Sequence, residues 1–169
     1  MLPKSKVLYN FWRVLSRNCG DFKLKYLCVD PGEVRIGIAI SDETGSLARP
    51  LAILGHVSRV IDAMGIMQLA LENQVDAIVV GQALDSNGKP GPKARSAARL
   101  AEALRVLGEM PVYLWDESYS SQKAAELRIA KGISRKKRAQ PIDDLAAAVI
   151  LQDFLEHYSG MSETNGTEQ

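Results

Sequence analysis

Carboxylates at the ends of predicted strands are the side chains whose types and spacing could do chemistry in this sequence. An apolar run over residues 26–29 ends in Asp30, and a second run over residues 112–115 ends in Asp116 and Glu117. A third pair, Asp143 and Asp144, opens the last strongly apolar stretch. Because ligand sites in open α/β sheets gather at the carboxyl ends of the strands, these acids predict one acidic site.

Three carboxylates brought into one site favour a bound divalent cation, since their negative charges would otherwise repel one another. Mg²⁺ accepts such oxygen ligands while keeping several waters, and Mn²⁺ is expected to substitute for it. One or two such ions can activate a water and stabilise the leaving oxygen when a phosphodiester is hydrolysed. The pattern therefore predicts metal-dependent phosphate chemistry.

Each acid also has a purely structural interpretation. Asp30 begins an Asp-Pro-Gly turn, in which aspartate is favoured. Asp116 is an alternative to Glu117 as the acid of the second strand. One of the pair Asp143 and Asp144 is expected to cap the last helix or to interact with its dipole. The residues alone leave these alternatives open.

Other reaction classes lack the residues that they need. The two histidines, His56 and His157, lie far apart without a nucleophile motif, which argues against a Ser-His-Asp hydrolase. Cys19 and Cys28 have no zinc-ligand spacing and form no disulfide framework, and Cys28 suits the core of a strand. The sequence contains neither a P-loop nor a dinucleotide-binding glycine motif.

The pattern of apolar residues predicts one α/β domain over residues 24–158. Strands are predicted at residues 25–30, 35–41, 47–54, 76–81 and 111–115, the first three as an antiparallel meander. Pro50 indicates that the third strand lies at a sheet edge. Helices are predicted at residues 58–73, 92–107, 120–130 and 143–157. This order predicts a mixed five-stranded sheet, with two parallel strands after the meander and helices on both faces.

Two helices allow a prediction of their buried faces. Ser58 is expected to cap the first helix. The apolar residues expected to face inward from it are Val60, Ile61, Met64, Met67 and Leu71. In the second helix the expected inward residues are Ala97, Leu100, Ala101, Leu104 and Leu107, with Arg95 and Arg99 outward.

Composition is that of a globular protein of 169 residues, with 46% hydrophobic and 24% charged residues. A net charge of +1 means that affinity for a polyanion must come from local clusters of cations. No apolar run approaches the roughly 18 residues that cross a bilayer, so we expect no membrane association. Because the two cysteines do not form a disulfide framework, we expect a reducing cytoplasm.

The two ends differ from the domain between them. Residues 1–23 are predicted to be a basic extension, in which Leu8, Phe11, Trp12 and Leu15 fall at helical spacing on one face. Packing of this extension on the domain is favoured over an interaction arm. Residues 159–169 are polar and are predicted to be a disordered tail.

A run of cations precedes the last acidic pair and favours contact with phosphates. Five cations lie within residues 131–138, immediately before the predicted last helix. The alternative is a solvated loop. We predict substrate contacts from Arg35, Lys93, Arg95, Lys136, Lys137 and Arg138, which would position a nucleic-acid backbone without reading its sequence.

These motifs together resemble the YqgF family, also called RuvX-like, within the RNase H-like superfamily. Asp30-x-Gly32 followed by residues 35–39 resembles the opening strand, turn and strand of the family. Val80-Gly81 with Asn87-Gly88 resembles its middle segment. Asp116-Glu117 and the pattern over residues 142–151 resemble its second and last acidic motifs. The match covers about residues 24–158.

The resemblance implies an RNase H-like fold and a catalytic, metal-binding site made from Asp30, Glu117 and Asp143. It implies hydrolysis of structured RNA, in the maturation of the 16S ribosomal RNA precursor, with the ribosome or its precursors as partners of a monomer or homodimer. Alternatives are cleavage of branched DNA (Holliday junctions) and a non-catalytic nucleic-acid-binding relative. The second arises because Ser118 stands where the family usually has an arginine. An actin-like ATPase would need two such domains.

Overall fold

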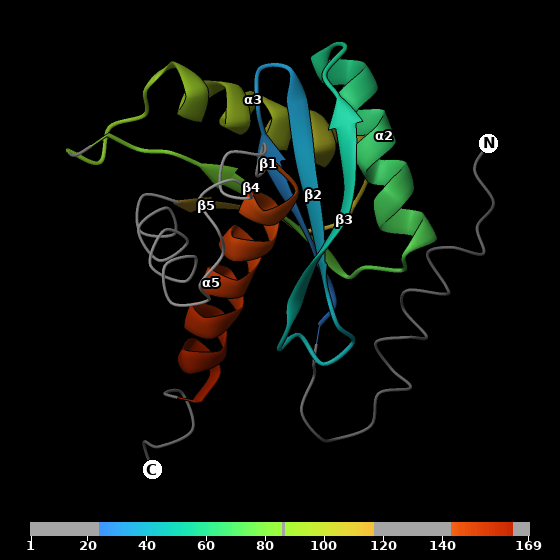
Figure 1. Ribbon diagram of the computed structural model, residues 1–169, viewed down its shortest axis with the longest axis vertical. Helices are drawn as coiled ribbons and strands as arrows, with labels where there is room; N and C mark the ends of the chain where they lie inside the picture. The colour runs from blue at the N-terminus through green and yellow to red at the C-terminus, as the bar shows by residue number, and fades with distance from the viewer. Residues whose placement is uncertain (1–23, 86, 117–142, 164–169) are drawn as a thin grey trace, which may run out of the picture.

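The protein is built on a five-stranded mixed sheet, seen in a computed structural model that describes residues 24–85, 87–116 and 143–163 (Figure 1). The strands are β1 (Tyr26–Pro31), β2 (Arg35–Ser41), β3 (Ala48–Gly55), β4 (Ala77–Gln82) and β5 (Val112–Asp116), in the spatial order β3-β2-β1-β4-β5. β1, β2 and β3 are antiparallel neighbours, whereas β4 and β5 continue the sheet parallel to β1. The predicted meander and the two parallel strands are confirmed, and β1 is the central strand.

Strand boundaries follow local chemistry. β1 is continuously apolar until Asp30, because its side chains are buried on both faces. β3 carries Pro50, which has no N–H to donate, and β3 lies at an edge of the sheet as that residue predicts.

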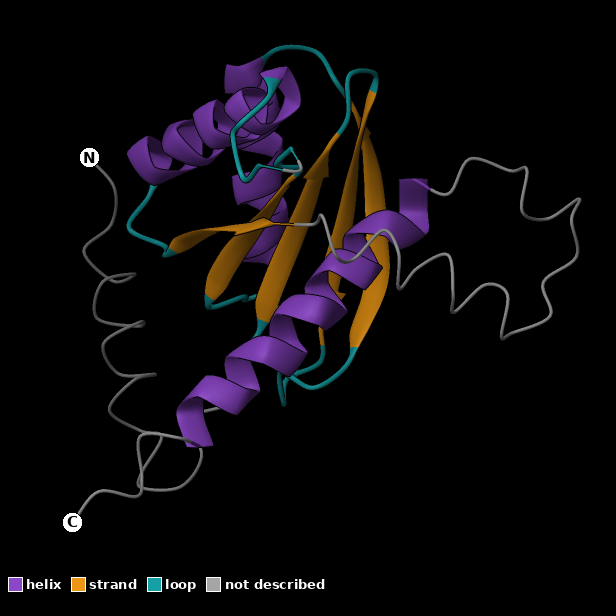
Figure 2. Ribbon diagram, turned by 90° about the vertical axis from the view of Figure 1, so that its left-hand side faces the viewer, coloured by secondary structure: helices purple, strands orange, loops and turns teal. Residues whose placement is uncertain are grey.

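Helices cover both faces of the sheet and create two separate cores (Figure 2). α2 (Arg59–Glu72) and α3 (Pro92–Leu107) pack on the face to which Leu27, Val29 and Ile78 point. α5 (Asp143–Glu163) packs on the other face, against Cys28 and Val79. The predicted placement of helices on both faces is confirmed.

The predicted buried face of α2 is wrong, although its cap is confirmed. The Ser58 hydroxyl accepts a hydrogen bond from the Ile61 backbone N–H. The buried residues of this helix are Asp62, Ala63, Ile66, Met67 and Ala70. Of the predicted set only Met67 is buried, whereas Val60, Ile61, Met64 and Leu71 are exposed. The helix is apolar on two sides, and the side that carries Ala63, Ile66 and Ala70 packs inward.

The predicted face of α3 is confirmed except at its last residue. Ala97, Leu100, Ala101 and Leu104 are buried, together with Ala94. Leu107 is 45% exposed, because it is the last helical residue before Gly108. Arg95 and Arg99 are exposed, as predicted.

α5 ends at Glu163, six residues beyond the predicted end at residue 157. The predicted helix over residues 120–130 and the run of cations within residues 131–138 lie outside the described residues, as does the extension over residues 1–23. The division into extension, domain and tail therefore stays a prediction. Among the described helices, none combines the length and hydropathy required to cross a membrane.

Candidate active site

Asp30 lies at the end of the central strand because β1 turns back on itself immediately after it. The register pairs Asp30 with Gly37 and Pro31 with Ile36 across the β1–β2 hairpin. The Gly32 N–H donates to the Arg35 carbonyl at 3.0 Å, and a Cβ on Gly32 would lie 2.4 Å from that same oxygen. The glycine of the Asp-x-Gly motif is therefore required by a close backbone approach, which holds Asp30 at the carboxyl end of β1.

Strand alternation places Asp30 and Asp116 on opposite faces of the sheet. Cys28 points into the core under α5 and Val29 into the core under α2 and α3, so Asp30 belongs to the α5 face. On β5, Trp115 belongs to the α5 face, which puts Asp116 on the other one. The Asp116 carboxylate accepts a hydrogen bond from the Leu84 backbone N–H at 3.4 Å. Asp116 is thereby disfavoured as a partner of Asp30.

α5 begins at the end of the sheet where β1 ends (Figures 1 and 2). Phe154, eleven residues into the helix, packs edge-to-face on Tyr26 at the start of β1, with ring centroids 5.2 Å apart. Going back from Phe154 to Asp143 covers about 16 Å of helix. Going along β1 from Tyr26 to Asp30 covers about 13 Å of strand. Since the helix runs against the direction of β1, its first residue comes to the level of Asp30.

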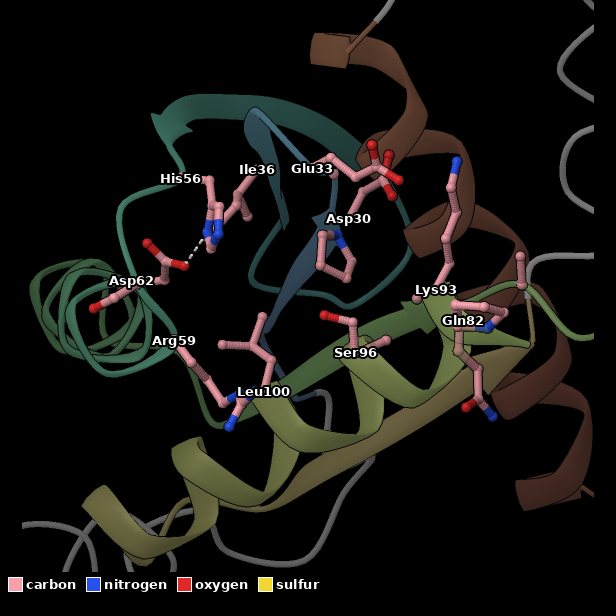
Figure 3. Close-up of a pocket in the computed structure, with 17 residues that line it drawn as sticks. Asp30, Glu33, Ile36, His56, Arg59, Asp62, Gln82, Lys93, Ser96 and Leu100 are labelled. Atoms are coloured by element: carbon pink, nitrogen blue, oxygen red, sulfur yellow. Dashed lines mark hydrogen bonds and ion pairs between the residues drawn. The ribbon is translucent and has the colours of Figure 1, made fainter. Parts of the chain in front are cut away.

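A pocket of about 660 Å³ opens at this end of the sheet, between the β1–β2 turn, the start of α2 and the start of α3 (Figure 3). Asp30 and Glu33 stand at its rim with their carboxylates on the α5 side. Lys93 extends toward that rim from the first turn of α3, and Ser96 points into the middle of the pocket. The pocket therefore has carboxylates and a lysine ammonium group among its lining side chains.

A histidine–aspartate pair forms the far wall of the pocket and was not anticipated from the sequence. His56 Nδ1 lies 2.6 Å from Asp62 Oδ2, and the other carboxylate oxygen accepts from the Val57 N–H at 3.1 Å. Asp62 is 5% exposed, so it acts as a buried anchor for the imidazole ring. The only sequence signal was an aspartate placed within a helix four residues after its cap.

The predicted substrate-binding cations are distributed unevenly. Lys93 lines the pocket. Arg95, two residues further along α3, is not part of the pocket wall, and its guanidinium donates to the Pro90 carbonyl at 2.8 Å. Arg35 begins β2 and is exposed. Arg59, which was not predicted, contributes a second cation to the pocket. The other three predicted cations, Lys136, Lys137 and Arg138, lie outside the described residues.

The end of β5 packs against α5. Trp115 donates its indole N–H to the Asp153 carboxylate at 3.0 Å and packs edge-to-face on Phe154. Asp153 is 5% exposed, and the Trp115 ring is partly buried. Trp115 therefore packs as part of the core rather than standing free as a base-stacking surface. This contact orients the strand end from which the chain continues to Glu117.

The described residues of the loop after β4 are joined by hydrogen bonds within the loop. The Asp85 carboxylate accepts from the Asn87 and Lys89 backbone N–H groups at 2.9 and 2.7 Å, and Gly88 adopts a φ of +71°. The positive φ explains why glycine follows Asn87 in the sequence, because glycine adopts such a φ without strain.

Among the described residues, the carboxylates at the pocket rim supply only some of the oxygen ligands that a hard divalent ion needs. Asp30 and Glu33 supply oxygen ligands of the kind that Mg²⁺ and Mn²⁺ prefer. No cluster of three potential metal ligands occurs among the described side chains. Glu117 and the Asp143 side chain, the other predicted ligands, lie outside them. The structure thus brings Asp30, the end of β5 and the start of α5 to one edge of the sheet.

Comparison with known proteins identifies the lineage of this domain. The family profile of RuvX, described as a Holliday junction resolvase, matches residues 24–157. This chain belongs to the RuvX family. A Bacillus cytotoxicus protein named "Putative pre-16S rRNA nuclease" is 39% identical over 136 residues, which cover 79% of this chain and 98% of the relative. A Bacillus thuringiensis protein of the same name is 40% identical over 136 residues.

Solved structures confirm the RNase H-like fold predicted for this RuvX family member. RuvC of Thermus thermophilus in complex with a Holliday junction substrate superimposes with a TM-score of 0.54 at 18% identity, covering 81% of this chain and 96% of that one. A second Thermus thermophilus RuvC structure gives a TM-score of 0.52 at 16% identity. At this level of identity the likeness extends to the fold alone.

Proposed function

We propose that this RuvX family member is a divalent-metal-dependent nuclease that hydrolyses phosphodiester bonds of structured RNA, in 5′-end processing of pre-16S rRNA. The observation that supports this proposal most directly is the location of Asp30 at the carboxyl end of the central strand, on the face covered by α5. The names of relatives 39–40% identical over nearly their whole length support the choice of RNA. A reducing cytoplasm is the proposed compartment.

The proposed site combines Asp30 with Glu117 and Asp143. If β5 continued extended by one residue, Glu117 would join Trp115 and Asp30 on the α5 face. β1 and β5 are separated only by β4, so these strand ends lie about 10 Å apart. Carboxylates at that spacing can reach a shared cation with their side chains.

These carboxylates would hold Mg²⁺, or Mn²⁺ in its place. The chemistry that such an ion supplies when bound is activation of a water and stabilisation of charge on the leaving oxygen. Lys93 extends toward the same rim and would hold a phosphate of the substrate near the acids. The cations Arg35, Arg95, Lys136, Lys137 and Arg138 are proposed to hold more distant phosphates.

Cleavage assays on a pre-16S rRNA 5′ leader with Asp30→Asn, Glu117→Gln and Asp143→Asn test the proposal. Each variant is expected to lose Mg²⁺-dependent cleavage while binding the RNA as the parent does. Asp116→Asn is the matched control and should stay active, because Asp116 faces the other side of the sheet. Activity in Asp30→Asn, or inactivity only in Asp116→Asn, would contradict the proposed site.

A second candidate substrate is branched DNA, which the description of the matching family profile favours. Parallel assays with the RNA leader and with a four-way DNA junction distinguish the two. Cleavage of the junction alone would replace RNA by branched DNA. Binding of either without any metal-dependent product would instead support a non-catalytic relative, the alternative raised by Ser118.

A further inference from the structure

α2 carries a second apolar face that no described residue covers. Val60, Ile61, Met64 and Leu71 on this helix, with Val57 just before it, are between 48% and 65% exposed. We call this set the α2 stripe. Because successive residues of an α-helix are rotated by about 100° around its axis, these positions lie on one side of α2, away from the buried residues Ala63, Ile66 and Ala70.

The α2 stripe differs from scattered surface hydrophobics. Single exposed apolar residues are ordinary, but a contiguous apolar patch on a folded domain marks a surface that something covers. The stripe runs most of the length of the helix, which is about 21 Å for its 14 residues. Its occupant must therefore be an elongated apolar element.

The described part of the chain begins at residue 24, beside the loop that follows α2. Lys25 is fixed to the loop after α2, because its N–H donates to the Asp76 carboxylate at 2.9 Å and its carbonyl accepts from the Asp76 N–H at 2.7 Å. Asp76 follows the last residue of α2, Glu72, by four positions. Figure 1 shows the start of β1 and the loop after α2 at the same end of the sheet. The described chain therefore starts near the C-terminal end of the α2 stripe.

The sequence before that point has the composition that the α2 stripe requires. Leu8, Phe11, Trp12 and Leu15 recur at helical spacing within residues 1–23, as established above. The eight residues 16–23 could span up to about 26–29 Å if extended, more than the length of α2. The segment is long enough to reach every part of the stripe.

We infer that residues 1–23 fold back on the domain and cover the α2 stripe with Leu8, Phe11, Trp12 and Leu15. The family match begins at residue 24, and the two Bacillus relatives are spanned almost completely by 79% of this chain. The extension is thus an addition to the family domain, joined to it beside the uncovered face. A second copy of the chain is the competing occupant.

A double-mutant cycle in the full chain tests this docking by thermal unfolding. Phe11→Asp and Met64→Lys should each lower Tm by about 4 °C or more, because each puts a charge into the apolar contact. The double variant should lose little more than either single one, since one charge already undocks the segment. Val106→Lys is the matched control, as Val106 is an apolar residue of α3 with 85% exposure. Its effect should be small and additive with Phe11→Asp.

Limited trypsin digestion supplies a second readout that does not depend on Tm. Cleavage after Arg13 and Arg17 should be about tenfold faster in Met64→Lys than in the parent or in Val106→Lys. Equal cleavage rates together with additive Tm shifts would overturn the inference. A dimer in sedimentation velocity that Phe11→Asp dissociates would also overturn it, because the stripe would then be covered by a second copy.

Discussion

Replacing Asp62 by asparagine should destabilise the protein by removing a buried anchor of the candidate active-site pocket. The Asp62 carboxylate accepts from the Val57 N–H at 3.1 Å and lies 2.6 Å from His56 Nδ1. Asparagine can present its one oxygen to only one of these two groups, and it lacks the negative charge. If the Val57 N–H keeps that oxygen, His56 Nδ1 faces the amide NH₂ group, which donates and does not accept.

The magnitude follows from the burial of each partner. Asp62 is 5% exposed, so losing its charge-assisted bond to a backbone N–H should cost about 1.5–2 kcal/mol. The His56 side chain is 43% exposed, so its contribution is screened and should stay below about 1 kcal/mol. Together these losses come to about 2 kcal/mol, which corresponds to a Tm lowered by about 4–8 °C in a chain of this size.

Urea unfolding of Asp62→Asn, His56→Ala and the double variant measures this loss and its coupling. We expect the double variant to be more stable than the sum of the single losses predicts, because both remove the same contact. Glu33→Gln, an exposed carboxylate on the same pocket, is the control and should change stability by less than about 0.5 kcal/mol. Wild-type stability of Asp62→Asn, or strictly additive losses, would refute the reasoning.

Three further changes test the structure around the site. Gly32→Ala should destabilise the protein by more than 1 kcal/mol and reduce cleavage, because the new Cβ would lie 2.4 Å from the Arg35 carbonyl oxygen; urea unfolding with normal stability would show that the turn yields at no cost. Lys93→Gln should flatten the dependence of log K on log salt by about 0.7–0.9 for RNA binding, and an unchanged slope would remove Lys93 from the path of the backbone. Asp153→Ala should cost about 1–3 kcal/mol by leaving the Trp115 indole N–H unpaired, whereas Asp153→Asn keeps an acceptor and should lose less; equal Tm values for the two variants would contradict this role of the bond.

The strands and their order in the sequence were accessible without coordinates, because burial on both faces makes a strand continuously apolar. β1 and β4 show this pattern directly, and Pro50 placed β3 at an edge. The helix start at Ser58 was equally readable, since a hydroxyl before an apolar repeat satisfies free backbone N–H groups. These signals are local, and each depends on a few neighbouring residues.

Periodicity failed where a helix is apolar on more than one side. The spacing of Val60, Ile61 and Met64 is as regular as that of Ala63, Ile66 and Ala70, and local pattern cannot rank the two faces. The domain buries the second of these faces and leaves the first exposed among the described residues. Close packing with neighbouring elements made that choice.

For the candidate site as well, the sequence predicted some features and the tertiary structure decided the others. Asp30, Glu117 and Asp143 were recognised from their positions after strands and before a helix, together with the family resemblance. The sequence could not say which neighbour faces which side of the sheet, because one residue of strand reverses the direction of a side chain. The register of β5 against β4 assigns Asp116 to the α2 and α3 face. Likewise, the pairing of His56 with Asp62 arises only when the end of β3 meets the first turns of α2, a contact that spacing along the chain does not specify.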